Sequence, residues 1–579
     1  MIKAEQLSYG FPQKDLYDKI SFTLEEGRHC ALIGSNGVGK TTLVDIIRTP
    51  EKFLFDGKLQ MEQVGRIGYV SQFARREGAQ EFTVFDCLAR DFLALQEEIG
   101  KVCAEMESAE DLDALLEHYQ TLLDESESMD ADNYESNIHR QLHLAALSEK
   151  AELPVSALSG GEYKLVQIIR QILRRPGLLI MDEPDVFLDF ENLESLRDLI
   201  NHYDGTLLVI THNRYLLGHC FDQIWHLENG DLQQFDGSFL QYNAALLQRK
   251  VELQEEADKQ QSEIDRVNEM VERLRDEATE VIDPLRGRTL KGKVSYLGRL
   301  MAKQIKPPFL NLHHPEIAFP AVEQEEETVL LEVKDYEVSF EKRLLEKVNF
   351  TVHAGEKVAI VGPNGTGKTT LLRALRENRN SAIEFAPEAK VAFFSQLQEE
   401  VLCGDNSILQ EFLDLGFETR EAVEEHLARY CFESDGLHRN VGQLSGGEKN
   451  LLQLARLEVS GANLLLLDEP SSHLDTYAQI ALEKAIRAYR GAVVMVSHDF
   501  YSIVNSADSI LVMEDGSLRP MSGRAFRKRI YKNHFSKEYL ELDLRRQELE
   551  SRIQKALGEK DHETAKALCQ ELEQVVNEM

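Results

Sequence analysis

One ordered series of short motifs occurs twice in this 579-residue chain. The glycine-rich segment GSNGVGKTT at Gly34–Thr42 returns as GPNGTGKTT at Gly362–Thr370. Downstream of each, the pentapeptide LSGGE occurs at Leu158–Glu162 and again at Leu444–Glu448. Because the motifs keep their order in both halves, the sequence predicts two copies of one domain.

Each copy is predicted to be α/β. Short apolar runs lie at matching places, at Leu178–Met181 and Leu207–Ile210 in the first copy and at Leu464–Leu467 and Val493–Val496 in the second. Such runs are typical of parallel strands that are buried on both faces. The predicted fold class is therefore α/β, with two tandem P-loop NTPase domains joined by a long helical hairpin linker and followed by a small C-terminal helical extension.

Predicted domain boundaries follow from the repeat and from shifts in composition. They are a first ATPase domain at 1–239, a linker at 240–325, a second ATPase domain at 326–522, and a basic segment with a helical hairpin at 523–579. The first domain carries a helical lobe with an acidic insertion at about 85–155, in which Asp91–Glu135 holds 15 acidic residues and one lysine. We interpret this insertion as a solvated helical hairpin in preference to a protein-binding arm.

The linker has the pattern of a long helix. Its apolar residues recur at spacings of three, four and seven, which predicts one packed seam: Leu246, Leu253, Ala257, Ile264, Val267, Val271 and Leu274. A helix over Leu240–Ile282 would be about 60 Å long at 1.5 Å per residue. Pro284, Gly287 and Gly292 are expected to break it before a shorter helix returns.

The chain is strongly acidic, with a net charge of −35. A chain this acidic repels polyanions on average, so any contact with nucleic acid requires local basic patches. Seven dispersed cysteines without a metal-binding spacing indicate free thiols in a reducing compartment. No secretory signal and no apolar run of membrane-spanning length are visible. We expect a cytoplasmic protein without a membrane partner.

The glycine-rich loops predict binding of ATP with Mg²⁺. Glycines let consecutive backbone N–H groups surround phosphate oxygens at the start of a helix. In such loops a lysine reaches the β- and γ-phosphates and a hydroxyl binds Mg²⁺, while an aspartate at a strand end holds the metal from the other side. The predicted nucleotide contacts are Gly34, Ser35, Asn36, Gly37, Val38, Gly39, Lys40, Thr41, Thr42, Gly362, Pro363, Asn364, Gly365, Thr366, Gly367, Lys368, Thr369 and Thr370. The predicted metal residues are Thr41, Asp182, Gln72, Thr369, Asp468 and Gln396.

Three further residue types in each copy are candidate catalytic residues. A glutamate directly after the metal-binding aspartate can polarise the attacking water as a general base. A histidine just after the next apolar strand can hydrogen-bond the γ-phosphate, and an upstream glutamine can contact Mg²⁺ and the attacking water. The candidates are Glu183, Glu469, His212, His498, Gln72 and Gln396.

These motifs resemble those of the ATP-binding cassette (ABC) family: Walker A, Q-loop, LSGGE signature, Walker B with its glutamate, D-loop and switch histidine. The resemblance covers nearly all of residues 1–237 and 328–522. It implies that the copies pack head to tail, so that ATP on each P-loop also meets the LSGGE residues of the other copy, and that two aromatic residues stack on adenine. The residues implied are Ser159, Gly160, Gly161, Glu162, Ser445, Gly446, Gly447, Glu448, Tyr9 and Phe340. ATP would then stabilise the closed pair, and its hydrolysis would release it.

Two cassettes on one chain with a long helical linker are similar to the F subfamily of ABC proteins. That resemblance implies a partner, the ribosome, with the linker contacting rRNA and tRNA near the peptidyl-transferase centre. Members serve as translation factors or protect ribosomes from antibiotics. EPSSHLD at Glu469–Asp475 is close to the EPTNHLD of the subfamily, whereas EPDVFLD at Glu183–Asp189 departs from it at Val186 and Phe187. The two ATP sites are therefore not expected to be equivalent in every respect.

Local charge favours an RNA partner. Pro284–Pro315 holds seven basic residues and no acid, and Gly516–Lys537 has the same balance. Clustered cations contact phosphates without sequence specificity, although a basic face that pairs with the chain's own acids is an alternative. The candidate RNA-binding residues are Arg286, Arg288, Lys291, Lys293 and Arg299.

Other functions remain open at this stage. A tandem ABC ATPase that acts on DNA or branched nucleic acid is one alternative, and the motor subunit of a transporter is a weaker one because its function has no use for a long basic-tipped linker. A scaffold that binds ATP without hydrolysis is disfavoured by Glu183 and Glu469. We expect a monomeric chain whose two cassettes form an intramolecular pair.

Overall fold

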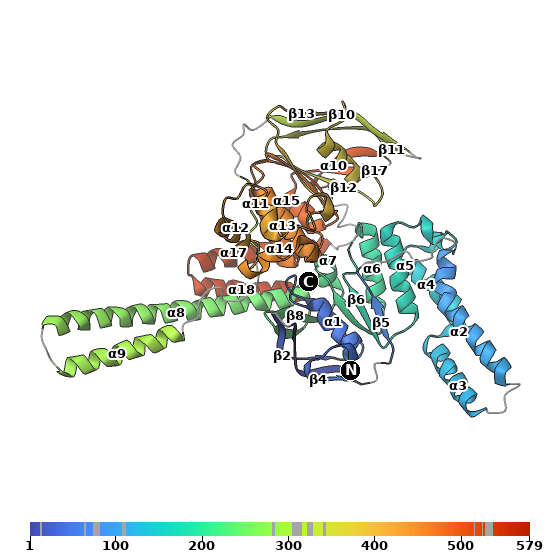
Figure 1. The fold of residues 1–579 in the computed structure, drawn as a ribbon, viewed down its shortest axis with the longest axis horizontal. Coiled ribbons are helices and arrows are strands. Elements are labelled where there is room, and N and C mark those ends of the chain that lie inside the picture. The colour runs from blue at the N-terminus through green and yellow to red at the C-terminus, as the bar shows by residue number, and fades with distance from the viewer. Residues whose placement is uncertain are drawn as a thin grey trace. The chain divides into compact units, whose positions relative to one another are not determined.

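The chain forms two compact units, Met1–Asp236 with His313–Ile530, and Gly237–Leu312 with Tyr531–Met579. The computed structural model describes most residues of both units (Figure 1). The described residues are 1–11, 14–62, 65–72, 82–106, 112–186, 188–280, 284–303, 315–320, 328–339, 343–514, 516–523, 525–526 and 537–579.

The larger unit contains both copies of the repeat, which we call cassette 1 and cassette 2. Cassette 1 is built on a six-stranded sheet of order β5-β6-β7-β3-β8-β9, in which only β9 runs antiparallel to its neighbour. Its strands are β3 (His29–Ile33), β5 (Ile67–Val70), β6 (Leu178–Asp182), β7 (Thr206–Ile210), β8 (Gln223–Glu228) and β9 (Asp231–Asp236). Every residue of β6 and β7 is buried, so the predicted parallel core strands are confirmed.

Cassette 2 repeats this topology with the order β14-β15-β16-β12-β17-β18. Its strands are β12 (Lys357–Val361), β14 (Val391–Phe394), β15 (Leu464–Asp468), β16 (Ala492–Val496), β17 (Ser509–Glu514) and β18 (Ser517–Ser522). Only β18 is antiparallel to its neighbour. The carboxyl ends of parallel strands lie along one edge of a sheet, so the residues that follow β6 and β7, or β15 and β16, are brought together there.

A second, three-stranded antiparallel sheet completes each cassette and closes one side of its core. In cassette 1 it has the order β2-β1-β4, and in cassette 2 the order is β11-β10-β13. The strands are β1 (Ile2–Phe11), β2 (Lys14–Leu24), β4 (Asp56–Met61), β10 (Val329–Ser339), β11 (Arg343–His353) and β13 (Ile383–Phe385). In each cassette these strands and the central sheet share one buried apolar cluster.

Helices flank the sheets and form the predicted helical lobes. Those of cassette 1 are α1 (Lys40–Arg48), α2 (Val84–Met106), α3 (Asp113–Ser128), α4 (Tyr134–Leu144), α5 (Gly160–Leu173), α6 (Phe190–Asn201) and α7 (Arg214–His219). Those of cassette 2 are α10 (Lys368–Glu377), α11 (Ile408–Leu413), α12 (Arg420–Ala428), α13 (Gly446–Glu458), α14 (Thr476–Ala488) and α15 (Phe500–Ser506). The acidic insertion forms the α2–α3 hairpin, which Figure 1 shows in blue.

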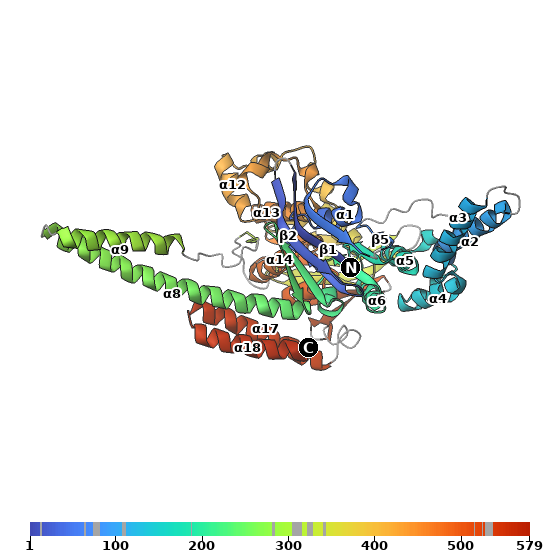
Figure 2. The ribbon, with the colours of Figure 1, turned by 90° about the horizontal axis from the view of Figure 1, so that it is seen from below.

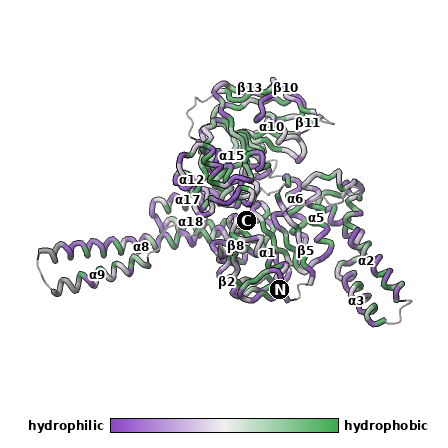
Figure 3. Tube along the Cα trace, in the orientation of Figure 1, coloured by the Kyte–Doolittle hydropathy of each residue, from purple (hydrophilic) through white to green (hydrophobic). Residues whose placement is uncertain are grey.

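The smaller unit is a helical assembly. The linker forms α8 (Phe239–Glu280) and α9 (Pro284–Ala302), and the C-terminal segment forms α17 (Lys537–Gly558) and α18 (His562–Glu578). Ile264, Val267 and Val271 of the predicted seam are buried against Leu297 of α9. The C-terminal hairpin lies along the first half of α8 (Figure 2), where Val251 enters its apolar cluster. Figure 3 shows hydrophobic residues gathered in the strands of both cassettes and hydrophilic residues along α8.

One expectation for the linker is wrong. Gly287 and Gly292 do not interrupt the helix, because α9 begins at Pro284 and runs through both. Proline is well tolerated in the first turn of a helix, where its missing N–H has no partner to lose. The basic segment is consequently a returning helix and not only a tip.

Candidate functional site

In each P-loop, the glycine directly before the following helix has a backbone conformation that a larger residue could adopt only with strain. Gly39 and Gly367 have φ values of 102° and 101° and directly precede α1 and α10. This left-handed conformation is the one that glycine adopts without steric cost. It turns the chain so that the loop encloses its own lysine.

The P-loop lysines are buried and bonded to their own loops. Lys40 Nζ donates to the carbonyl oxygens of Gly34 and Ser35 at 2.8 and 3.0 Å. Lys368 Nζ donates to those of Gly362 and Pro363 at 2.8 and 2.7 Å. Burial lowers the pKa of both lysines, only partly opposed by nearby carboxylates. An anion in the loop would stabilise the charged form of each lysine.

A threonine and an aspartate meet beside each P-loop. Thr41 Oγ1 donates to Asp182 Oδ2 at 3.3 Å, and Thr369 Oγ1 donates to Asp468 Oδ1 at 3.1 Å. Burial raises the pKa of each aspartate to about 6. A hydroxyl and a carboxylate at this spacing are oxygen ligands of the kind that Mg²⁺ prefers.

The P-loop of cassette 1 contacts cassette 2. Asn36 N donates to Asp475 Oδ2 at 3.3 Å, and Asn36 Nδ2 donates to the His473 carbonyl oxygen at 2.9 Å. Gly447 lies so close that an added Cβ would stand 1.9 Å from Asn36 Nδ2. The cavity here has a volume of about 280 Å³ and is lined by P-loop residues of cassette 1 together with Ser445, Gly446 and Gly447 of cassette 2. We call it site 1.

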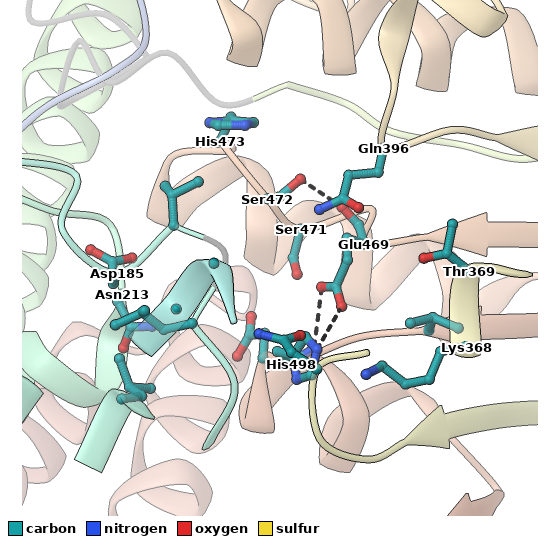
Figure 4. A pocket seen from close by; sticks show the side chains of 18 of the residues that line it. Asp185, Asn213, Lys368, Thr369, Gln396, Glu469, Ser471, Ser472, His473 and His498 are labelled. Atoms are coloured by element: carbon teal, nitrogen blue, oxygen red, sulfur yellow. Dashed lines mark hydrogen bonds and ion pairs between the residues drawn. The ribbon is translucent and has the colours of Figure 1, made fainter. Parts of the chain in front are cut away.

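The P-loop of cassette 2 contacts cassette 1 in the same way. Asn364 N donates to Asp189 Oδ2 at 3.0 Å. A cavity of about 430 Å³ is lined by residues of this P-loop together with Gly160 and Gly161 of cassette 1. Figure 4 shows Lys368, Thr369 and Gln396 on one side of this cavity and Asp185 and Asn213 on the other. We call this cavity site 2.

The LSGGE segments begin helices that point into the two cavities. Ser159 caps α5 and Ser445 caps α13, each through a capping box with the glutamate three residues later. Glu162 also pairs with Lys150, and Glu448 with Arg439. The serine and glycines are thus backbone donors at a helix N-terminus, whereas both glutamates are engaged within their own cassette.

The two candidate bases differ in their surroundings. Gln72 Nε2 donates to Glu183 Oε2 at 2.5 Å, and His473 Nδ1 lies 3.4 Å from the same oxygen. Burial raises the pKa of Glu183, but the His473 contact and nearby cations outweigh it and lower the pKa below its ordinary value. Burial and the charge of Asp468 raise the pKa of Glu469 to about 8.

The switch histidines are buried and neutral. Burial lowers the pKa of His212 and of His498 to about 3. His212 Nε2 and His498 Nδ1 have no hydrogen-bond partner within the described part of the chain. His498 lies close to Glu469, with its backbone N–H donating to Glu469 Oε2 at 3.2 Å. A buried nitrogen without a partner is costly, so each of these atoms fits a polar ligand such as a phosphate oxygen.

The aromatic residue beside site 1 is not the one predicted. Tyr9 packs against the core of cassette 1, with its ring centroid 5.7 Å from those of Phe11 and Phe53. Phe11, which is 52% exposed, lines site 1 instead. Residues two apart in a strand share a face, and the rings of Tyr9 and Phe11 are in edge-to-face contact, so sequence reasoning could not tell which of the two lines the cavity. Phe340 lies outside the described residues.

The candidate RNA-binding residues belong to α9. Lys291 and Arg299 are exposed and Lys293 is half-buried, whereas the side chains of Arg286 and Arg288 are outside the described part. No helix among the described residues has the length and apolar character to cross a bilayer.

Comparison with known proteins identifies the family. The profile of the ABC transporter family matches residues 17–186 and 345–472, and an extension profile of the same description matches 225–283. ABC transporter F family member 5 of Arabidopsis thaliana is 30% identical over 541 residues, which cover 90% of this chain and 76% of that protein. This chain is an ABC-F protein. Its two cassettes make it an ATP-binding ATPase.

A further relative matches most of the chain, and two solved structures share its fold. The uncharacterized ABC transporter ATP-binding protein YfmM of Bacillus subtilis is 28% identical, with 86% of the ABC-F chain and 96% of YfmM covered. A solved RNase-L inhibitor has the same fold with a TM-score of 0.53 at 20% identity, covering 91% of this chain and 93% of that one. An archaeal ABCE1, solved in complex with the ribosomal stalk protein aP1, has a TM-score of 0.51 at 19% identity, with 92% of each chain covered.

Proposed function

We propose that this ABC-F chain binds the ribosome and uses ATP-driven closure of its cassettes to position the α8–α9 linker near the tRNA and peptidyl-transferase region. The observation that carries the proposal is the linker itself. Its returning helix α9 holds five cations and no acid in a chain of net charge −35. A basic helix on an acidic protein is suited to RNA phosphates, which attract clustered cations whatever their sequence.

Two further observations support a ribosomal partner. The solved relatives of the same fold include an ABCE1 described as an archaeal ribosome recycling factor and one described as ribosome-bound with Pelota. The C-terminal hairpin packs along the root of α8, where Lys566 pairs with Glu255 and His562 with Asp258. A braced root suits a linker that must hold its tip in place, because it removes bending freedom from the first half of α8.

At each ATP site we propose a role for each side chain of the predicted set. Lys40 and Lys368 bind phosphates, Thr41 with Asp182 and Thr369 with Asp468 hold Mg²⁺, and Gln72 and Gln396 reach the metal and the attacking water. Glu183 and Glu469 act as general bases. His212 and His498 contact the γ-phosphate, and Phe11 stacks on adenine at site 1. A Mg²⁺ ion held by these residues would supply positive charge that offsets the negative charge of the phosphates.

The first test removes both bases. Glu183→Gln with Glu469→Gln should abolish ATP hydrolysis and hold the protein on ribosomes in ATP, because a carboxamide cannot take the proton of water while the closed state persists. Sucrose-gradient cosedimentation with ribosomes and release of phosphate are measured together. Glu117→Gln with Glu421→Gln, two exposed acids on α3 and α12, is the matched control. Unchanged turnover, or retention on DNA or membranes instead of ribosomes, would refute the proposal.

A second test addresses α9. Replacing Lys291, Lys293 and Arg299 by alanine should weaken ribosome binding, with a smaller difference from the wild type at higher salt, because salt already weakens these phosphate contacts in the wild type. If this triple variant bound ribosomes as well as the wild type, α9 would not be part of the contact.

A translation factor and an antibiotic-protection protein would share this geometry. Drug tolerance in cells that overproduce the protein distinguishes them.

A further inference from the structure

The two D-loops carry different residues at the position where the second loop has a histidine. The second loop carries His473 in EPSSHLD, and the residue at the matching position of the first loop is Phe187 in EPDVFLD. Phe187 is outside the described residues, but a phenylalanine side chain has no hydrogen-bonding atom in any placement. The loops therefore cannot make the same contacts with a catalytic carboxylate.

His473 reaches across to the reactive residues of cassette 1. Its Nδ1 lies 3.4 Å from Glu183 Oε2 and 3.2 Å from Gln72 Nε2, which in turn donates to Glu183 at 2.5 Å. The imidazole is only 12% exposed. Site 1 thus contains a cluster of three side chains, two from cassette 1 and one from cassette 2, around the candidate base.

The backbone of His473 is held by the P-loop of site 1. Its carbonyl oxygen accepts from Asn36 Nδ2 at 2.9 Å, and two residues later Asp475 accepts from the Asn36 backbone N–H at 3.3 Å. His473 itself has a φ of 57°, a left-handed conformation that costs energy for a residue other than glycine. The imidazole can therefore reach Glu183 only while this loop is docked on Asn36.

The described partners of Glu469 at site 2 come from its own cassette. Its carboxylate accepts from the His498 backbone N–H at 3.2 Å and lies 3.6 Å from His498 Nε2, both within cassette 2. The ring of Phe190, from cassette 1, approaches His498 with centroids 6.2 Å apart but offers no polar atom. The base of site 2 is thus oriented by its own cassette.

We propose that His473 is a positioning residue supplied in trans, which orients Glu183 and Gln72 for hydrolysis at site 1 only when the cassettes are closed, and that site 2 has no such dependence on the first D-loop. The orientation of the base at site 1 would then depend on the D-loop of cassette 2, whereas the base of site 2 would be oriented without a D-loop side chain from cassette 1. The inference depends on the ATPase activity and not on ribosome binding, so failure of either leaves the other standing.

Single-turnover cleavage of bound ATP by the full-length protein tests this. In a Glu469→Gln background, where site 1 alone retains its base, His473→Ala should slow cleavage at least tenfold while the ATP concentration for half-saturation changes less than threefold. His473→Gln, which keeps a hydrogen-bonding group, should recover part of the rate. In a Glu183→Gln background, His473→Ala should change the rate of site 2 less than twofold.

Phe187→Ala in the Glu183→Gln background is the matched control and should also stay within twofold. Equal slowing by His473→Ala in both backgrounds would mean a structural role in closure, and no slowing in the Glu469→Gln background would mean no role. If His473→Gln cleaved ATP no faster than His473→Ala, the effect of His473 would not come from a hydrogen bond, which would contradict the proposal. A tenfold loss in the Phe187→Ala control would contradict the asymmetry.

Discussion

Gly447 is the residue at which the signature loop of cassette 2 meets the P-loop of cassette 1. A Cβ at this position would stand 1.9 Å from Asn36 Nδ2 and 2.5 Å from the His473 carbonyl oxygen. Neither contact can be relieved by a rotamer change alone, because Asn36 is itself hydrogen-bonded to that carbonyl group. The glycine therefore permits the close approach of α13 to Asn36 of cassette 1 and to the D-loop of its own cassette, and not a particular backbone angle.

Gly447→Ala should lower ATPase activity at least tenfold, because one methyl group prevents the loops from docking. Cassette 1 should keep its fold, since the methyl group meets it at the Asn36 side chain, whereas cassette 2 must also move its own His473 carbonyl oxygen, 2.5 Å away. Phosphate release and thermal unfolding measure the two effects, and Gly100→Ala in α2, where an added Cβ meets nothing within 4 Å, is the control. Full activity in the Gly447 variant would show that hydrolysis does not require this approach.

Among the elements, the acidic hairpin is attached to cassette 1 by a charged anchor. Asp91 of α2 accepts from Arg170 Nε and Nη2 at 2.9 and 2.7 Å and from Arg174 Nε at 2.7 Å. Arg170 lies on α5, and Arg174 directly follows that helix. Burial alone would raise the pKa of Asp91, but the two guanidinium groups lower it well below its ordinary value of 3.8. These hydrogen bonds thus fasten the first helix of the acidic hairpin to the segment that contains α5. Most of the charged side chains of the hairpin itself face solvent.

Asp91→Asn should lower the free energy of unfolding of cassette 1 by about 2 kcal/mol, typical for hydrogen bonds to charged groups. Because folding lowers this pKa, the stabilisation is complete above pH 5 and is lost as pH falls through the value of the unfolded chain towards that of the folded one. Calorimetry should show the wild type and the variant converging below about pH 4. Glu97→Gln, whose partner Lys101 is exposed, should change little at any pH. A difference in the free energy of unfolding between the wild type and Asp91→Asn that persists in acid would contradict this interpretation.

At the scale of the whole molecule, the larger unit joins its cassettes through a buried ion cluster. Arg214 of cassette 1 pairs with Glu483 and, at 3.2 Å, with Asp499 of cassette 2. The Arg214 and Glu483 side chains are 12% and 7% exposed. Arg214 follows His212 by two residues and Asp499 directly follows His498, so the cluster connects the two switch-histidine loops and thereby the two ATP sites.

Arg214→Met should weaken closure, because it leaves the buried carboxylate of Glu483 without its counter-charge, a loss of about 3–5 kcal/mol for such pairs. The ATP concentration needed for closure, followed by fluorescence transfer between labels on the two cassettes, should rise at least tenfold. Adding Glu483→Gln should restore part of the affinity by removing the stranded charge. A double variant as impaired as the single one would show that the cluster acts through packing and not through charge.

Much of the fold could be predicted from local sequence. Motif order predicted the duplication, and continuous apolar runs predicted the parallel strands, because a strand covered on both faces must be apolar throughout. The periodicity of the linker predicted α8, and the C-terminal segment forms two helices as the predicted hairpin requires. The P-loop lysine, threonine and aspartate of each copy come together because their strands end at one edge of the sheet.

Contacts between segments that are far apart in the sequence could not be predicted from local patterns. The packing of Val251 against the C-terminal hairpin, the exposure of Phe11 in place of Tyr9, the Arg214 cluster and the approach of His473 to Glu183 have no local period. The sequence by itself determined two ATP-binding cassettes and a helical linker, because glycine loops, apolar strands and helical seams are local patterns. Only the tertiary structure decided which residues of one cassette complete the site of the other, because that depends on how two folded surfaces meet.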